Sequence, residues 1–304
     1  MLQLLLGGSG SGKTTLLYQR IRTRAEKGEK SILLVPEQFT SSTEGRIYRE
    51  LGDALSGMVE SFSFTSLAEK ILSTEGGAAV QTLSDAGRAV LVRRALEELQ
   101  DNVHYYHRHR RSAAFCQMAA QTIDELKSAG LSGRQLAQLA GACGAESGKL
   151  SELALIFQGY ETLLARSGMD PSDRLELAGA RLEEALARHS LPEFLRDRAM
   201  FIDEFDTFNA PKKRLLGAML AALPSVTVAL CDDGSPLLPG DLSLFSGAKQ
   251  VAAQLRQLAR KNGAEVAVPQ LLRKDLRHRN ALGLAAVAEL LETGSCTADA
   301  PAGE

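Results

Sequence analysis

A glycine-rich segment near the start of the chain constrains its fold more than any other feature. Residues 7–14 read GGSGSGKT and match the phosphate-loop pattern G-x-x-x-x-G-K-[ST]. An apolar run, Leu2 to Leu6, precedes the segment, and a helical pattern from Lys13 to Lys27 follows it. The pattern has its chemical meaning only between a buried strand and a helix. The sequence therefore predicts a strand, a phosphate-binding loop and a helix in succession.

Such a loop holds the phosphates of a nucleotide. Glycines let backbone N–H groups curl around phosphate oxygens, and the positive end of the following helix points at them. Lys13 is expected to reach the β and γ phosphates, and the Thr14 hydroxyl to hold Mg²⁺. We therefore expect ATP and Mg²⁺ as cofactors; the alternative is a glycine-rich turn that merely caps a helix. The residues predicted to bind the nucleotide are Gly7, Gly8, Ser9, Gly10, Ser11, Gly12, Lys13, Thr14 and Thr15.

A phosphate loop needs an acidic partner on a neighbouring strand to position the metal. The apolar run Met200 to Ile202 ends in Asp203 and Glu204. We expect Asp203 to hold Mg²⁺ together with Thr14, and Glu204 to be the catalytic residue that accepts a proton from the attacking water. The alternative is a buried strand whose acidic end simply meets solvent.

The rest of the chain alternates between two patterns. Strand-like runs occur at 31–35, 58–64, 198–202, 225–231 and 264–268, with helical patterns at 44–55, 211–223 and 247–262 among them. Only helical patterns occupy roughly residues 83–189. We predict an α/β fold, a RecA-like parallel sheet with an inserted all-α lobe. The predicted domains are a discontinuous P-loop domain (1–82 and 196–304) and a helical lobe (83–195), with a frayed end at 293–304.

Composition excludes several classes of protein. The hydrophobic and charged fractions, 44% and 24%, are typical of a globular chain, and no apolar run is long enough to span a bilayer. The four cysteines form no C-x-x-C pair, which favours reduced thiols and a cytoplasmic location. The net charge of -2 means that any contact with nucleic acid must come from a local patch.

Two stretches are candidates for such a patch. The segment HYYHRHRR at 104–111 offers Arg108, Arg110 and Arg111 for phosphates, and tyrosines that can stack on bases. A solvated loop or helix end, or a histidine metal site, are the alternatives. Gln38 and Thr40 follow the second predicted strand and could contact DNA phosphates, or they could form a turn and a helix cap.

Four segments resemble one family in particular. Leu4 to Thr15, Ile32 to Thr40 (ILLVPEQFT, with Glu44 after it), Met58 to Phe64 and Phe201 to Phe208 (FIDEFDTF) are similar to blocks of AddB-type subunits of bacterial AddAB helicase-nucleases. The VPEQFT segment is the distinctive one, because many ATPase families share a phosphate loop. A helical insertion before the acidic strand is also found in the first motor domain of superfamily 1 helicases, which this chain resembles.

The resemblance implies a subunit that processes double-strand DNA ends for recombination together with an AddA-type motor subunit. It also implies an N-terminal fragment, because AddB-type chains continue into a second motor-like domain and a nuclease domain. We therefore expect poor ATP hydrolysis by this chain alone. The family of motors usually has Gly-Asp-x-x-Gln after the strand that follows the acidic one, but residues 230–235 read LCDDGS without a glutamine. A structural or DNA-recognition module that binds ATP without motor activity, and an unrelated P-loop enzyme, are the alternatives.

Overall fold

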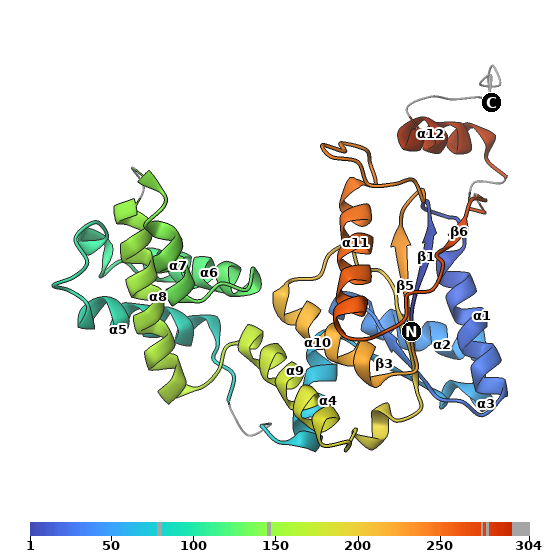
Figure 1. Ribbon diagram of the computed structural model, residues 1–304, viewed down its shortest axis with the longest axis horizontal. Coiled ribbons are helices and arrows are strands. Elements are labelled where there is room, and N and C mark those ends of the chain that lie inside the picture. Colours follow the sequence, from blue (N-terminus) through green and yellow to red (C-terminus); the bar gives the residue numbers. More distant parts are fainter. Residues whose placement is uncertain (78–80, 145–146, 275, 278–279, 294–304) are drawn as a thin grey trace. The chain divides into compact units, whose positions relative to one another are not determined.

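A six-stranded sheet carries the candidate residues (Figure 1). The computed structural model describes residues 1–77, 81–144, 147–274, 276–277 and 280–293, so the end at 294–304 that the sequence predicts to fray lies outside the described residues. All pairings in the sheet are parallel, in the order β3-β2-β4-β5-β1-β6. The strands are β1 (Leu2–Gly7), β2 (Ser31–Leu34), β3 (Val59–Phe62), β4 (Ala199–Ile202), β5 (Ser225–Cys231) and β6 (Gln270–Leu272).

The strands are apolar because helices cover both faces of the sheet. Every residue of β2 and β4 is buried, as expected for central strands of a parallel sheet. Helix α1 (Lys13–Glu26) buries Leu17, Tyr18 and Ile21 and contacts β1, β2 and β5. Helix α11 (Ser246–Lys261) contacts β1 and β5 and lies on the opposite side of the sheet from α1 in Figure 1. The α/β fold with a parallel sheet predicted from the sequence is confirmed.

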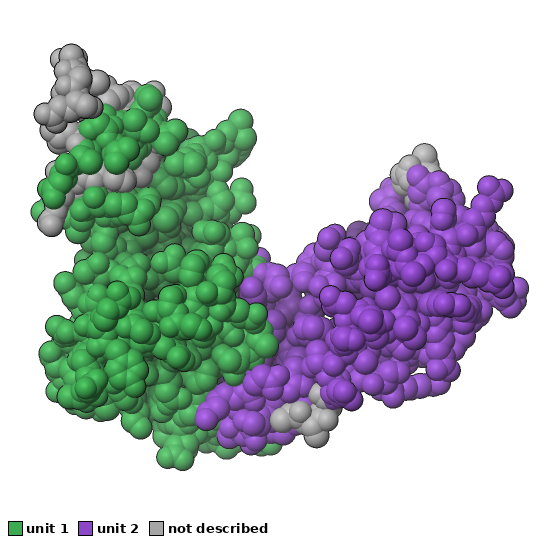
Figure 2. Space-filling model, turned by 180° about the vertical axis from the view of Figure 1, so that it is seen from behind, with its two compact units in different colours: residues 1–67, 185–208, 216–304 green, residues 68–184, 209–215 purple. Residues whose placement is uncertain are grey.

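Two compact units divide the chain (Figure 2). The first consists of 1–67, 185–208 and 216–304 and contains the sheet; the second consists of 68–184 and 209–215 and is helical. The domain boundaries predicted at 82/83 and 195/196 stay a prediction.

The remaining helices are α2 (Thr40–Leu51), α3 (Asp53–Ser56), α4 (Phe64–Glu75), α5 (Asp85–Glu98), α6 (Ala113–Ser128), α7 (Gly133–Ala140), α8 (Ser147–Ser167), α9 (Pro171–Ala187), α10 (Ala210–Ala222) and α12 (Leu282–Thr293), with 3₁₀ turns η1 (Glu37–Phe39), η2 (His107–His109) and η4 (Glu193–Leu195). None of the described helices is long and apolar enough to cross a membrane.

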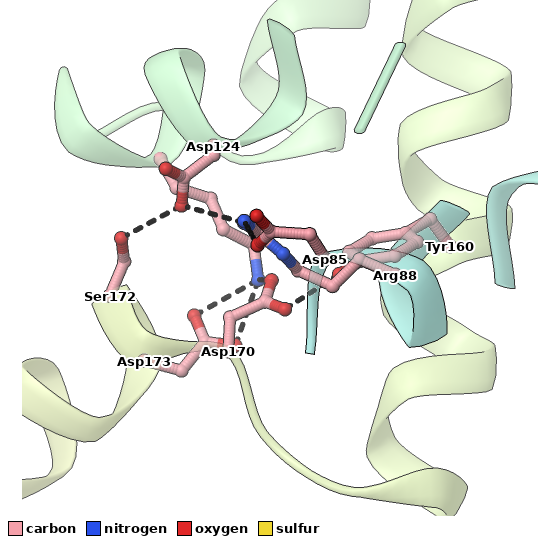
Figure 3. Close-up of polar contacts among 8 residues, drawn as sticks. Asp85, Arg88, Asp124, Tyr160, Asp170, Ser172 and Asp173 are labelled. Atoms are coloured by element: carbon pink, nitrogen blue, oxygen red, sulfur yellow. Dashed lines mark hydrogen bonds and ion pairs between the residues drawn. The ribbon is translucent and has the colours of Figure 1, made fainter. Parts of the chain in front are cut away.

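Helices α5, α6 and α8 pack around an apolar core in the helical unit. A polar network joins them to the start of α9 (Figure 3). The Lys127 ammonium binds the Asp170 and Asp173 carboxylates at 2.7 and 2.8 Å, and the Tyr160 hydroxyl donates to Asp170 at 2.6 Å. Asp170 is almost fully buried; Lys127 balances its charge, and Tyr160 supplies a second hydrogen bond to the carboxylate. Near it, Arg88 joins Asp85 and Asp124 at 2.7 and 3.3 Å.

Several boundaries differ from the sequence-based ones. The strand predicted at 264–268 is wrong: only Val266 forms a bridge to Leu2, and the ladder with β1 resumes at β6. Pro269 has no N–H to donate and separates the two pairings. Helix α2 begins at Thr40 and ends at Leu51, because Gly52 has a φ of 75° and breaks it before residue 55.

Candidate nucleotide-binding site

The glycine-rich loop joins the carboxyl end of β1 to the first turn of α1. Gly12 is the residue before α1 and has a φ of 88°, a left-handed conformation that favours glycine. Gly7 is required for a different reason: a Cβ there would collide with the Ser11 Oγ and lie 2.6 Å from the Leu272 carbonyl oxygen. The strand, loop and helix predicted at this position are confirmed.

Lys13 folds back over the loop. Its ammonium donates hydrogen bonds to the carbonyl oxygens of Gly7 and Gly8, both at 2.8 Å. These carbonyls are uncharged acceptors, so the cation has no carboxylate to neutralise it in these two contacts. An anion with more negative oxygens could replace them.

Thr14 and Asp203 meet in the same pocket as Lys13. Asp203 follows β4, and its N–H continues the ladder to the Leu34 carbonyl at 3.1 Å. The side chain is buried, with 6% exposed. Burial raises the pKa of the Asp203 carboxyl; the nearby Thr14 hydroxyl lowers it, and the neighbouring Glu204 carboxylate raises it again.

Glu204 has an unusual backbone. Its φ of 63° lies in the left-handed region, which costs a non-glycine residue about 1 kcal/mol or more. Its N–H donates to the Asp203 Oδ1 at 3.0 Å, which fixes the turn after β4. Glu204 is exposed and lines the same pocket as Lys13 and Thr14. Strained residues of this kind cluster at functional sites.

One open pocket of about 460 Å³ brings most of the predicted residues together. Its lining includes Ser9, Gly10, Gly12, Lys13, Thr14, Thr15, Asp203 and Glu204. The other three loop residues, Gly7, Gly8 and Ser11, line a neighbouring pocket of about 610 Å³, which also contains Asp232 and Asp233 at the end of β5.

Sequence reasoning missed two arginines in the first pocket. Arg46 lies on α2, with its guanidinium 4.8 Å from the centre of the Tyr18 ring, and it lowers the pKa of Asp203. Arg277 follows β6 and donates to the Ser9 Oγ at 3.1 Å, while the adjacent Leu276 N–H donates to the Gly10 carbonyl at 3.0 Å. No motif marks either arginine, because only the fold brings α2 and the segment after β6 to the loop.

Gln38 and Thr40 do not line this pocket. The Thr40 hydroxyl donates to the Glu37 carbonyl within η1, the local turn that the sequence allowed as an alternative, and Gln38 is exposed. Arg108, Arg110 and Arg111 belong to the helical unit. DNA contact by these five residues stays a prediction.

The donor set fits a hard divalent cation bound through phosphate. No group of three or more His, Cys, Asp or Glu side chains within the described residues could hold a metal alone. Mg²⁺ at nucleotide sites keeps waters and phosphate oxygens and takes only one or two protein ligands. One hydroxyl and one carboxylate, from Thr14 and Asp203, meet that requirement.

Comparison with known proteins decides the family. The model of the family described as ADDB, N-terminal, matches residues 4–287. The chain belongs to the AddB family. The match runs through both compact units and includes every residue predicted for the nucleotide site. The resemblance stated from four short segments is thereby confirmed.

Curated relatives agree with this assignment. The chain is 34% identical over 279 residues to the B subunit of the ATP-dependent helicase/deoxyribonuclease of Desulforudis audaxviator, covering 88% of this chain and 23% of that protein. The proteins of the same name from Moorella thermoacetica and Geobacillus kaustophilus are 32% and 31% identical, over 87% and 92% of this chain and 24% of each relative. The AddB-type chain thus spans about a quarter of the length of these relatives.

Proposed function

We propose that the chain binds ATP with Mg²⁺ at the carboxyl ends of β1 and β4, as the nucleotide-binding N-terminal portion of an AddB-type subunit. The observation that carries this proposal is that Thr14 and Asp203 line one pocket with Lys13, where the Thr14 hydroxyl lowers the pKa of the Asp203 carboxyl. A cation for phosphate and a pair of oxygen ligands for a metal are then present in one pocket.

Each side chain has a definite part in this proposal. Lys13 exchanges the Gly7 and Gly8 carbonyl oxygens for β and γ phosphate oxygens, because charged acceptors bind an ammonium more strongly. Thr14 and Asp203 hold the metal, which neutralises charge on the phosphates. Glu204 lies exposed in the pocket, where it can accept a proton from water.

Arg46 and Arg277 add positive charge to the pocket. Arginine contacts to the γ phosphate stabilise the charge that develops during hydrolysis. These two residues therefore support slow hydrolysis by the chain itself. Residues from parts of the relatives that this chain does not span would be needed for rapid turnover.

A second candidate is a module in which ATP serves only as a conformational ligand. The segment after β5 favours it, because Asp232 is buried and accepts the Gly234 N–H at 2.7 Å, and no glutamine follows within that turn. The segment could then not report γ-phosphate loss through a glutamine.

In either case we propose that the subunit acts in the cytoplasm with an AddA-type subunit on double-strand DNA ends, as an ATP-dependent helicase/deoxyribonuclease for repair by recombination. This step rests on the names of the relatives.

Calorimetric titration tests the nucleotide proposal. The chain is titrated with ATP, ADP and AMP, each with and without MgCl₂. We expect affinity to fall in the order ATP, ADP, AMP, and Mg²⁺ to strengthen binding of ATP most, because Lys13 and the metal act on the β and γ phosphates. Equal affinity for AMP and ATP, or no saturable binding, would overturn the proposal. Phosphate release measured with the same samples separates hydrolysis from binding alone.

A further inference from the structure

An open aromatic pocket lies in the helical unit, which contains none of the residues of the nucleotide site. The cavity has a volume of about 340 Å³. It is lined by Tyr105, Tyr106, His109, Ala114, Phe115 and Met118. Tyr105 and Met118 are more than half exposed, at 56% and 57%, although both are large apolar or aromatic side chains. The pocket therefore offers ring faces and a thioether directly to solvent.

Contacts within the chain hold the backbone and the rings of this pocket in place. The Glu152 carboxylate on α8 accepts the backbone N–H groups of His104, Tyr105 and Tyr106 at distances of 2.8–3.2 Å. The Tyr106 and Phe115 rings lie 5.3 Å apart, and His109 lies 5.7 Å from Phe115, with an angle of 31° between the ring planes in both pairs. A rigid ring platform loses little conformational entropy when a flat ligand stacks on it.

Basic residues adjoin this aromatic pocket in the chain. The segment 104–118 contains three arginines and three histidines and no acidic residue. Arg108 and Arg111 are exposed, and the Lys149 ammonium lies 5.2 Å from the centre of the Tyr105 ring. The Glu152 carboxylate, which holds the segment in place, is engaged by three backbone N–H groups. The basic residues of this segment and Lys149 therefore suit an anion, and the aromatic lining of the pocket suits a flat ring.

We propose that this pocket binds an unstacked base of single-stranded DNA, with Arg108 and Arg111 on the adjoining phosphates. Single-stranded nucleic acid combines an aromatic ring with an anionic chain, and proteins bind it by pairing aromatic platforms with basic side chains. An apolar side chain of a protein partner would use the aromatic lining but would gain nothing from the arginines. The choice of DNA over RNA rests on the proposed function. The proposal that the pocket binds an unstacked base does not depend on that function.

Fluorescence anisotropy with two labelled oligonucleotides tests the proposal at low salt. One is a single-stranded oligothymidylate, and the other has the same length and phosphates but no bases. The variants are Tyr105→Ala, which removes an exposed ring, and Tyr105→Phe, which keeps it. Tyr48→Ala is the matched control, because Tyr48 is 59% exposed in the other unit. Circular dichroism of each variant verifies that the chain is folded.

We expect the chain to bind the oligothymidylate more tightly than the abasic strand. Tyr105→Ala should lower affinity for the oligothymidylate by about fivefold or more, the loss for one stacked base. Tyr105→Phe and Tyr48→Ala should bind as the parent does. Equal affinity for both strands, or an unchanged affinity of Tyr105→Ala, would overturn the proposal and leave the pocket as a surface for a protein. Lys13→Ala should bind the oligothymidylate through this pocket, because Lys13 lies in the other unit. A wrong assignment of the ATP site would therefore be recognised separately from a wrong assignment of this pocket.

Discussion

Thr14 and Asp203 line one pocket, although the helical unit separates the two residues in the chain. The two residues meet because β1 and β4 belong to one parallel sheet with only β5 between them. In parallel sheets the carboxyl ends of the strands lie at one edge, where ligands bind. The insertion therefore leaves the site intact.

Asp203→Asn should abolish the strengthening of ATP binding by Mg²⁺. The amide keeps the size of the side chain and one oxygen, but it is a far weaker ligand for a hard cation. ATP affinity is measured by calorimetry with and without MgCl₂. Asp232→Asn is the control, because Asp232 is similarly buried at the end of the neighbouring strand β5. An undiminished Mg²⁺ effect in Asp203→Asn would remove this residue from the metal site.

The same carboxyl should make ligand-free stability depend on pH. Burial raises the pKa of Asp203 in the folded chain above its unfolded value of 3.8, so the folded state binds the proton more tightly. Its contribution to stability is then full below that unfolded value and is lost as pH rises through the folded pKa. Asp203→Asn should flatten this slope and raise the melting temperature at neutral pH. Parallel melting curves of parent and variant between pH 4 and pH 7 would contradict the assignment.

The sequence predicts a residue of this site only where a local sequence pattern marks that residue. The apolar runs before Gly7 and Asp203 mark buried strands, and glycine spacing marks the loop, so these elements could be predicted. Arg46 lies on an ordinary amphipathic helix, and Arg277 follows a strand of only three residues. Their positions arise from tertiary packing against the loop, which no local pattern encodes.

The strands and helices also divide into those that a local sequence pattern predicts and those that it does not. The mostly apolar run AEVAV predicts a strand at 264–268, but Pro269 follows it and the ladder with β1 resumes only at Gln270–Leu272. Helix α12 reads LGLAAVAELLET, with apolar residues on all sides, so its sequence has no clear amphipathic period. The exposed residues Leu284, Val287 and Leu291 lie on one of its faces. Continuous apolar runs therefore predict the central strands correctly, whereas the edge strand β6 depends on where the ladder can resume after a proline.

Gly12→Ala should weaken both the fold and ATP binding. The left-handed φ of 88° costs alanine about 1–2 kcal/mol, and the added Cβ would lie 2.9 Å from the Leu276 Cδ1. Gly28→Ala is the matched control, because Gly28 has a φ of 75° and nothing within 4 Å of the added Cβ. Urea unfolding should show a similar backbone cost in both variants, whereas only Gly12→Ala should lose ATP affinity. ATP binding by Gly12→Ala at the parent level would mean that the loop geometry is not needed.

Replacing Arg108, Arg110 and Arg111 together by alanine should flatten the salt dependence of DNA binding. Removing one arginine–phosphate interaction lowers the slope of log affinity against log salt by about 0.7 for a single strand. Anisotropy with a labelled oligonucleotide at several salt concentrations measures the slope. Arg93→Ala with Arg94→Ala is the control, because these arginines are exposed in the same unit and pair with Glu97 and Glu98. An unchanged slope in the triple variant would assign the cluster to ordinary surface.

The affinity of Lys13→Ala for ATP tests the central claim most directly. The substitution removes the cation that the loop carbonyls hold at 2.8 Å and leaves the loop backbone in place. Calorimetry with ATP and MgCl₂ compares the parent, Lys13→Ala and Lys27→Ala, which removes an exposed lysine at the other end of α1. We predict an affinity at least about tenfold lower for Lys13→Ala, the loss of one charge-assisted hydrogen bond, and an unchanged affinity for Lys27→Ala. Equal affinity of Lys13→Ala and the parent would contradict the nucleotide site.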